Sequence, residues 1–207
     1  VTLEDAIIYE AGAPNTPGIT FDSNSNKVVV GYADGGDSNK GKAIVGTISG
    51  TDISFGTAAV FNNARTAAIT LAYDSNAKRI SVAFKDRDNS NQGTGVVGTV
   101  SGTGISFGSE VVFETGATSK VGSAFDPDTN KVIISYQDNG DSNHAKAVIG
   151  TISSTSISFG TPVTVLAATS NETSVAYDTA LNKAVVSVDD GGGARGIANG
   201  LTGIGSK

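Results

Sequence analysis

A fixed period of 52 residues constrains this chain more than any other feature. Ile53-Ser54-Phe55-Gly56 recurs as Ile105-Ser106-Phe107-Gly108 and as Ile157-Ser158-Phe159-Gly160. One period before Ile53 lies Val1, and the residues that follow it fit the same template. Self-similarity at such a period is the mark of a repeat architecture. We therefore predict one domain over residues 1–207, made of repeats 1–52, 53–104, 105–156 and 157–207.

Each repeat has the pattern of short antiparallel strands. In the first repeat the strands are predicted at Gly18–Asp22, Lys27–Asp34, Lys42–Ser49 and Ile53–Phe61, rich in β-branched residues and separated by turn residues. Asp22–Asn26 and Ser49–Asp52 have the composition of tight hairpin turns. Four strands repeated about every 50 residues are typical of propeller blades, so the predicted fold is an all-β, four-bladed β-propeller.

Closure of the ring is predicted to depend on the amino-terminal segment. The fourth repeat ends before its own outer strand, and Val1–Tyr9 has the sequence of that strand. Pairing of this segment with the last repeat would remove both exposed sheet edges. The alternative is an open stack or fibre of repeats, in which Val1–Tyr9 pairs with a neighbouring molecule.

The innermost strand of each repeat alternates small and large residues. Gly18 and Thr20 of the first repeat alternate with Ile19 and Phe21, and the other repeats follow the same scheme. Only small side chains fit around a narrow central axis. We expect the large side chains to pack between blades.

Composition argues against several classes of function. The net charge is −6 and the 14 basic residues are scattered, whereas nucleic-acid binding needs clustered Lys and Arg. No apolar run approaches the roughly 18 residues of a membrane span, so membrane insertion is not expected. The chain has no Cys, which excludes disulfides and thiolate chemistry.

Oxygen-rich loops follow the second strand of every repeat, and loops on a rigid scaffold often carry binding residues. The candidate ligand-binding residues on this rim are Asp34, Asp37, Asn39, Asp86, Asp88, Asn91, Asp138, Asp141, Asn143 and Asp190. Carboxylate and amide oxygens are ligands for Ca²⁺, so Ca²⁺ is a candidate cofactor although no complete calcium motif is present. The alternative is that these side chains only cap the strand ends and order the loops.

Catalytic residues are not predicted. A serine nucleophile needs a base held beside it, and the single histidine, His144, lies in a loop where the other repeats have Lys40 and Gln92. We expect a binding or structural protein rather than an enzyme.

Two phrases of the repeat carry a resemblance to known proteins. Val45–Thr51, with its counterpart Val97–Thr103, and Ala72–Asn76 resemble repeats of virion structural and tail-associated proteins of marine bacteriophages and of related bacterial surface proteins. The resemblance implies an extracellular or virion location, no cofactor, a structural or attachment role, and oligomerisation. Its implied partners are other virion or surface proteins and host glycans. A glycan- or calcium-binding propeller is the alternative function.

Overall fold

The computed structural model describes residues 6–193 and 195–201, and these residues form strands and one short 3-10 helix. The elements are β1 (Pro14–Asp22), β2 (Lys27–Asp34), η1 (Gly35–Asp37), β3 (Lys40–Ser49), β4 (Asp52–Phe55), β5 (Ala59–Asp74), β6 (Arg79–Asp86), β7 (Gln92–Ser101), β8 (Gly104–Phe107), β9 (Val111–Asp126), β10 (Lys131–Asp138), β11 (His144–Ser153), β12 (Ser156–Phe159), β13 (Val163–Asp178), β14 (Lys183–Asp190) and β15 (Arg195–Leu201). The predicted all-β class is confirmed. No helix within the described ranges is long and apolar enough to cross a membrane.

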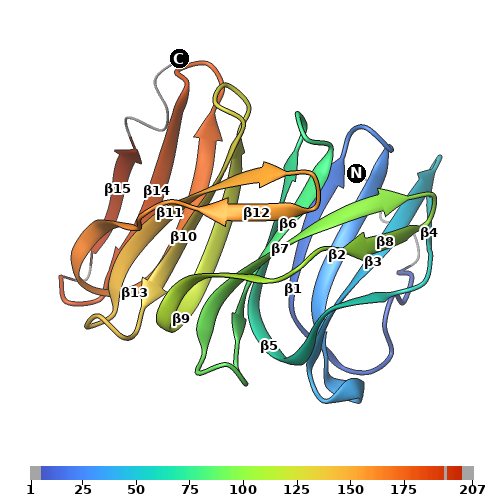
Figure 1. Ribbon diagram of the computed structural model, residues 1–207, viewed down its shortest axis with the longest axis horizontal. Coiled ribbons are helices and arrows are strands. Elements are labelled where there is room, and N and C mark those ends of the chain that lie inside the picture. Colours follow the sequence, from blue (N-terminus) through green and yellow to red (C-terminus); the bar gives the residue numbers. More distant parts are fainter. Residues whose placement is uncertain (1–5, 194, 202–207) are drawn as a thin grey trace.

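The strands form four antiparallel groups that follow one another along the molecule (Figure 1). Group 1 contains β1 to β4, group 2 contains β5 to β8, group 3 contains β9 to β12, and group 4 contains β13 to β15. The 16-residue strands β5, β9 and β13 link the groups. The first part of each pairs with the third strand of the preceding group, and the second part is the inner strand of its own group.

Both predicted hairpins are present. Asp22 Oδ1 accepts hydrogen bonds from the backbone N–H groups of Asn24 and Ser25, and Asn26 closes the turn with a left-handed φ of 55°. Asp74, Asp126 and Asp178 accept the same pair of bonds in the other groups. At the second hairpin Ser49 pairs with Asp52, and Gly50 has a φ of 63° that suits a two-residue turn.

The predicted fourth strand, Ile53–Phe61, is wrong as a single strand. The chain instead forms β4, breaks at Gly56, and resumes as β5, so that β3 pairs with β4 at one end and with β5 at the other. Gly56 lies against the hairpin of group 2, where a Cβ atom would be 1.9 Å from the carbonyl oxygen of Thr103. Glycine is required by this close approach. The chain turns there toward the next group.

Aromatic rings form three clusters at positions one period apart, two of them between consecutive groups. Each cluster has three rings. One ring lies ahead of the inner strand of a group, or early in the long strand that leads into it, and it contacts one ring on the second strand and one ring on the short outer strand of that group. The ring centroids are 5.1–5.9 Å apart. The three clusters are Tyr9, Tyr32 and Phe55; Phe61, Phe84 and Phe107; and Phe113, Tyr136 and Phe159. Such pairs add about 0.5–1.5 kcal/mol each beyond the area they bury.

Ring closure is not shown. Residues 1–5 of the predicted closing segment Val1–Tyr9 lie outside the described residues, and Ala6–Tyr9 form no strand. Tyr9 packs on Tyr32 and Phe55 of group 1, while β15, in group 4, lies at the opposite end of the molecule (Figure 1). Among the described residues, no strand pairing joins group 4 back to group 1.

Candidate functional site

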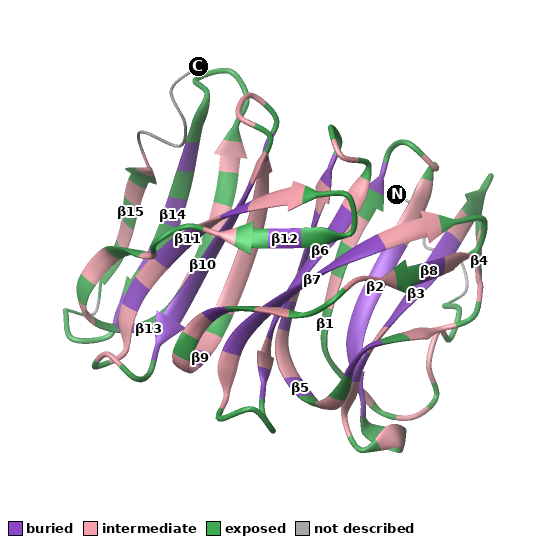
Figure 2. Ribbon diagram, in the orientation of Figure 1, coloured by how far each residue is buried: buried purple, intermediate pink, exposed green. Residues whose placement is uncertain are grey.

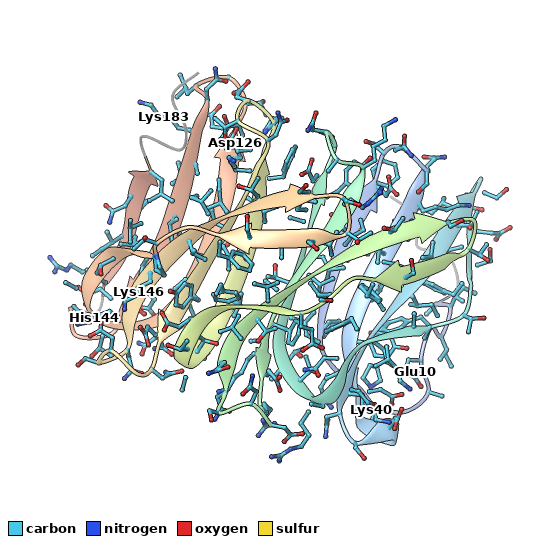
Figure 3. All side chains as sticks on the ribbon, in the orientation of Figure 1. Glu10, Lys40, Asp126, His144, Lys146 and Lys183 are labelled. Carbon is cyan, nitrogen blue, oxygen red and sulfur yellow. The ribbon has the colours of Figure 1, made fainter. Side chains whose placement is uncertain are left out.

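The loops that follow β2, β6, β10 and β14 lie on one edge of the molecule, here called the loop rim. The bends of β5, β9 and β13 join it, because the N–H groups of Thr66, Thr118 and Ser170 bond to the carbonyl oxygens of Asn39, Asn91 and Asn143. Figure 3 shows Glu10, Lys40, His144 and Lys146 toward this edge and Asp126 and Lys183 at the opposite edge. The segment Asn62–Ala67 is a continuous part of β5.

The four aspartates that end the second strands are buried and cap the loops. Asp34 Oδ1 accepts the N–H of Gly36 at 2.8 Å, and Asp138 Oδ1 accepts those of Gly140 and Asp141 at 2.9 and 3.1 Å. Asp86 and Asp190 accept two loop N–H groups each at 3.1–3.2 Å. One oxygen of each carboxylate is thus used to order its own loop.

A lysine ammonium occupies the space between the carboxylates in groups 1 and 3. Lys42 Nζ lies 2.7 Å from Asp34 and 3.0 Å from Asp37, and Lys146 Nζ lies 2.7 Å from Asp138 and 2.9 Å from Asp141. The hydrogen bond from Lys42 lowers the pKa of Asp34, and the bond to Asp138 raises the pKa of Lys146 to about 12. In groups 1 and 3 a protein cation therefore lies between carboxylates that were candidate ligands for Ca²⁺. Among the described residues, no three or more His, Asp or Glu side chains gather as a metal site.

The remaining predicted rim residues have structural contacts. Asn39, Asn91 and Asn143 have left-handed φ values of 59–62° and direct the chain into the third strand. Asp88 bonds to Arg65 at 2.7 Å, and His144 Nδ1 lies 3.5 Å from Asp141. Each of these positions thus has a role in loop geometry. Their role in binding a ligand stays a prediction.

A second site, which the sequence did not predict, lies where the inner strands begin. The cavity measures about 440 Å³ and is here called the inner pocket. It is lined by Thr16, Pro17, Ala67, Ala68, Ile69, Lys85, Ser119, Lys120, Val121 and Glu172. These residues come from all four groups.

The inner pocket is built at a break in strand pairing. The register shifts between Asn15 and Gly18, between Ala67 and Thr70, and at the matching points of groups 3 and 4. Bulges of this kind re-aim side chains and are frequent beside binding sites. Thr16, Ala68 and Lys120 have positive φ values of 47–55°, so the irregular backbone recurs from group to group.

The charge of the inner pocket is mixed. Lys120 forms an ion pair with Glu172, and Lys85 contributes a second ammonium. Desolvation by burial, followed by repulsion from Arg87, lowers the pKa of Lys85. A partly desolvated amine beside polar and small residues suits a ligand with acidic and hydroxyl groups. A repeat alignment could have indicated the site, because Thr16, Ala68, Lys120 and Glu172 occupy one repeat position with four different side chains.

Comparisons with known proteins support the fold. No family model matches the sequence. No curated protein matches it. A solved structure of a leech intramolecular trans-sialidase, in complex with 2,7-anhydro-Neu5Ac, is similar with a TM-score of 0.58 and 11% sequence identity. The similarity covers 83% of this chain and 28% of the leech protein, and it supports an all-β fold of repeated strand groups that resembles a sialidase propeller domain.

Proposed function

We propose that this protein is a non-enzymatic structural or attachment module that binds its partner through the inner pocket. The observation that carries the proposal is the position shared by Thr16, Ala68, Lys120 and Glu172. The break in strand pairing recurs in all four groups, and the left-handed backbone recurs at Thr16, Ala68 and Lys120, whereas the four side chains differ in size and charge. A repeated scaffold that carries different side chains at equivalent positions is a typical form of a binding site.

The proposed location is a phage virion or a cell surface. Support comes from the resemblance of Val45–Thr51 and Ala72–Asn76 to repeats of virion and bacterial surface proteins, and from a charged-residue content of 16%, which leaves much of the surface to Ser, Thr, Asn and Gly. Other virion or surface proteins are the proposed partners.

Glycan binding is the second candidate. Lys85 offers an ammonium group to a carboxylate, and Thr16 and Ser119 offer hydroxyl groups in the same cavity. The leech protein was crystallised with an acidic sugar derivative, and the same class of ligand suits the inner pocket.

A glycan array with acidic and neutral sugars tests this candidate. We expect retention of carboxylate-bearing glycans and a clear loss of signal in the Lys85→Gln variant. Lys27→Gln is the matched control, since Lys27 bonds to Thr47 at the start of β2, away from the pocket. Equal binding by both variants, or no glycan signal, would exclude the pocket as a glycan site.

Calcium dependence is tested by thermal unfolding with Ca²⁺ and with a chelator. We expect the same Tm in both, because Lys42 and Lys146 already neutralise the rim carboxylates of groups 1 and 3 and no three carboxylates gather elsewhere among the described residues. A higher Tm in Ca²⁺ than in chelator would contradict this expectation and indicate that the loop rim binds Ca²⁺.

Closure of the four groups into a ring stays a prediction. It requires Val1–Tyr9 to pair along the edge of β15; Ala6–Tyr9, the described part of that segment, and β15 lie at opposite ends of the molecule.

A further inference from the structure

Adjacent groups fit together through one recurring contact. In group 1, Gly18 and Gly31 face group 2, and a Cβ atom on either would lie 2.8–2.9 Å from Leu71 Cδ1. Leu71 thus fills the space above two glycines. At the next junction the equivalent residues Thr70 and Ser123 share a hydrogen bond of 2.9 Å.

The third junction uses the same positions. A Cβ atom on Gly122 would lie 3.3 Å from Ser174 Cα and 3.5 Å from the backbone nitrogen of Val175. Gly122 is equivalent to Gly18, and Val175 is equivalent to Leu71. At each junction in the described chain, residues of the later group therefore lie against small residues of the earlier one.

Group 1 presents the projecting half of this contact to solvent. Ile19, one period before Leu71, is 66% exposed, whereas Leu71 is 6% exposed. Phe21 on the same strand is 49% exposed, and Ile7 and Ile8 ahead of β1 are 51% and 79% exposed. Large apolar side chains gathered at one end of a molecule mark an interaction surface.

Group 4 presents the receiving half. Along β14 buried and exposed residues alternate strictly, whereas β6 and β10 are buried on both faces (Figure 2). The exposed face has a hollow of about 360 Å³, lined by Glu172, Thr173, Ser174, Ser187, Val188, Asp189 and Gly196. Ser174 and Ser187 are the equivalents of Gly18 and Gly31.

The edge of β15 in group 4 is complementary to the segment ahead of β1 as well. The third strands β3, β7 and β11 each pair with a following strand, whereas β15 pairs only with β14 among the described residues. In group 1, Ala43 of β3 pairs with Gly31, and Lys42 pairs with Tyr32. In group 4, Ala198 and Ile197 of β15 pair with Ser187 and Val188, the equivalents of Gly31 and Tyr32. Ala198 and Ile197 are therefore the structural equivalents of Ala43 and Lys42.

The register of the missing pairing follows from the repeat. Ala43 pairs with Ala59, and Lys42 pairs with Val60. One period before Ala59 and Val60 lie Ile7 and Ile8. The repeat therefore places Ile7 opposite Ala198 and Ile8 opposite Ile197.

We propose that two copies of this chain associate head to tail. The segment 6–10 of one copy adds a strand along β15 of the other, and Ile19 enters the hollow between Ser174 and Ser187. A second copy is the occupant because the two complementary faces lie at opposite ends of one molecule, so they meet most directly between molecules (Figure 1). Such a heterologous contact builds a ring if its rotation closes and a filament if it does not.

Disulfide trapping between two single-cysteine variants tests the proposal. The chain has no cysteine of its own, so Ile7→Cys and Ala198→Cys each introduce a unique thiol. Mixed and oxidised, the two variants should give a covalent heterodimer on a non-reducing gel. Ala43→Cys with Ala59→Cys in one chain is the positive control, because the same register is observed there.

The remaining outcomes of trapping oppose the proposal. In a double variant that carries both Ile7→Cys and Ala198→Cys, a disulfide that forms only within the monomer would show closure inside one chain. Homodimers of Ile7→Cys alone would indicate a symmetric contact. Absence of any cross-link while the positive control forms would show that the two ends do not meet.

Sedimentation of the cysteine-free chain provides a second readout. Ile19→Asp should weaken self-association about tenfold or more, because it places a carboxylate in the hollow instead of a buried apolar side chain. Leu181→Asp is the matched control. Leu181 is 69% exposed in the hairpin turn between β13 and β14, and it does not line the hollow. Equal association of both variants would contradict the proposed contact.

Discussion

Groups 2 and 3 have the same backbone but stabilise the loop rim by different chemistry. In group 3, Glu114 accepts a 2.9 Å hydrogen bond from Tyr136, and Lys146 bridges Asp138 and Asp141. Group 1 repeats this network with Glu10, Tyr32, Asp34, Asp37 and Lys42. The equivalent positions of group 2 hold Asn62, Phe84 and Thr94.

The difference leaves polar atoms of group 2 without partners. Asn62 Nδ2 and Thr94 Oγ1 are buried and have no hydrogen bond, although Asp86 still caps its loop. The strand framework therefore does not need the ionic network. The aspartate that accepts backbone N–H groups is the element common to all groups, and the lysine is an addition that neutralises it.

The largest expected effect in this comparison is that of Lys146→Met. The substitution leaves Asp138, which is 3% exposed, without its counter-ion, and the loss of one partner of a buried pair costs about 3 kcal/mol. Urea unfolding monitored by circular dichroism measures it. A change below about 0.5 kcal/mol would mean that water replaces the ammonium without penalty.

Thr94→Val should have the opposite sign. Removal of a buried hydroxyl without a partner, at nearly constant volume, is expected to stabilise the protein by about 1 kcal/mol. The same unfolding assay applies, with Thr99→Val as a second buried, unpartnered hydroxyl. Destabilisation of Thr94→Val would indicate that the hydroxyl binds an ordered water.

The pH dependence of the free energy of unfolding should change in Lys42→Gln of group 1, which has the lysine network, but not in Thr94→Val of group 2, which lacks it. The hydrogen bond from Lys42 holds the pKa of Asp34 below its ordinary value of 3.8. This contribution to stability is fully present above the unfolded pKa and disappears as pH falls through the folded pKa. Lys42→Gln should therefore lose less stability than wild type on acidification below about pH 4, whereas Thr94→Val should follow the wild-type profile. Parallel curves for wild type and Lys42→Gln would show that Lys42 does not control the titration.

The smallest effect is expected at the surface of group 2. Arg65 and Asp88 form an ion pair at 2.7 Å, with exposed fractions of 55% and 43%. Exposed pairs contribute little, so Arg65→Gln should leave the Tm unchanged at physiological salt. A clear fall in Tm would mean that Arg65 orders the loop by more than its charge.

Local signals explain how much of this structure could be predicted. The period of 52 residues, the Asx turns at Asp22 and its equivalents, and the two-residue hairpin at Gly50 depend on short-range geometry, and they are confirmed. The break at Gly56 was missed, because its cause is the carbonyl oxygen of Thr103 in the next group. The inner pocket was missed for the same reason, since no single repeat contains it.

The first three strands of each repeat, the turns and the 52-residue repetition follow from the sequence, because alternation and turn chemistry act within a few residues. Packing in three dimensions decides where the fourth strand breaks, which oxygen atoms bind lysine, and which side chains of four groups converge on the inner pocket. These depend on how one group packs against the next. Equivalent residues such as Ile19 and Leu71 are alike in sequence, yet one is exposed and the other buried because only one of them has a preceding group to contact.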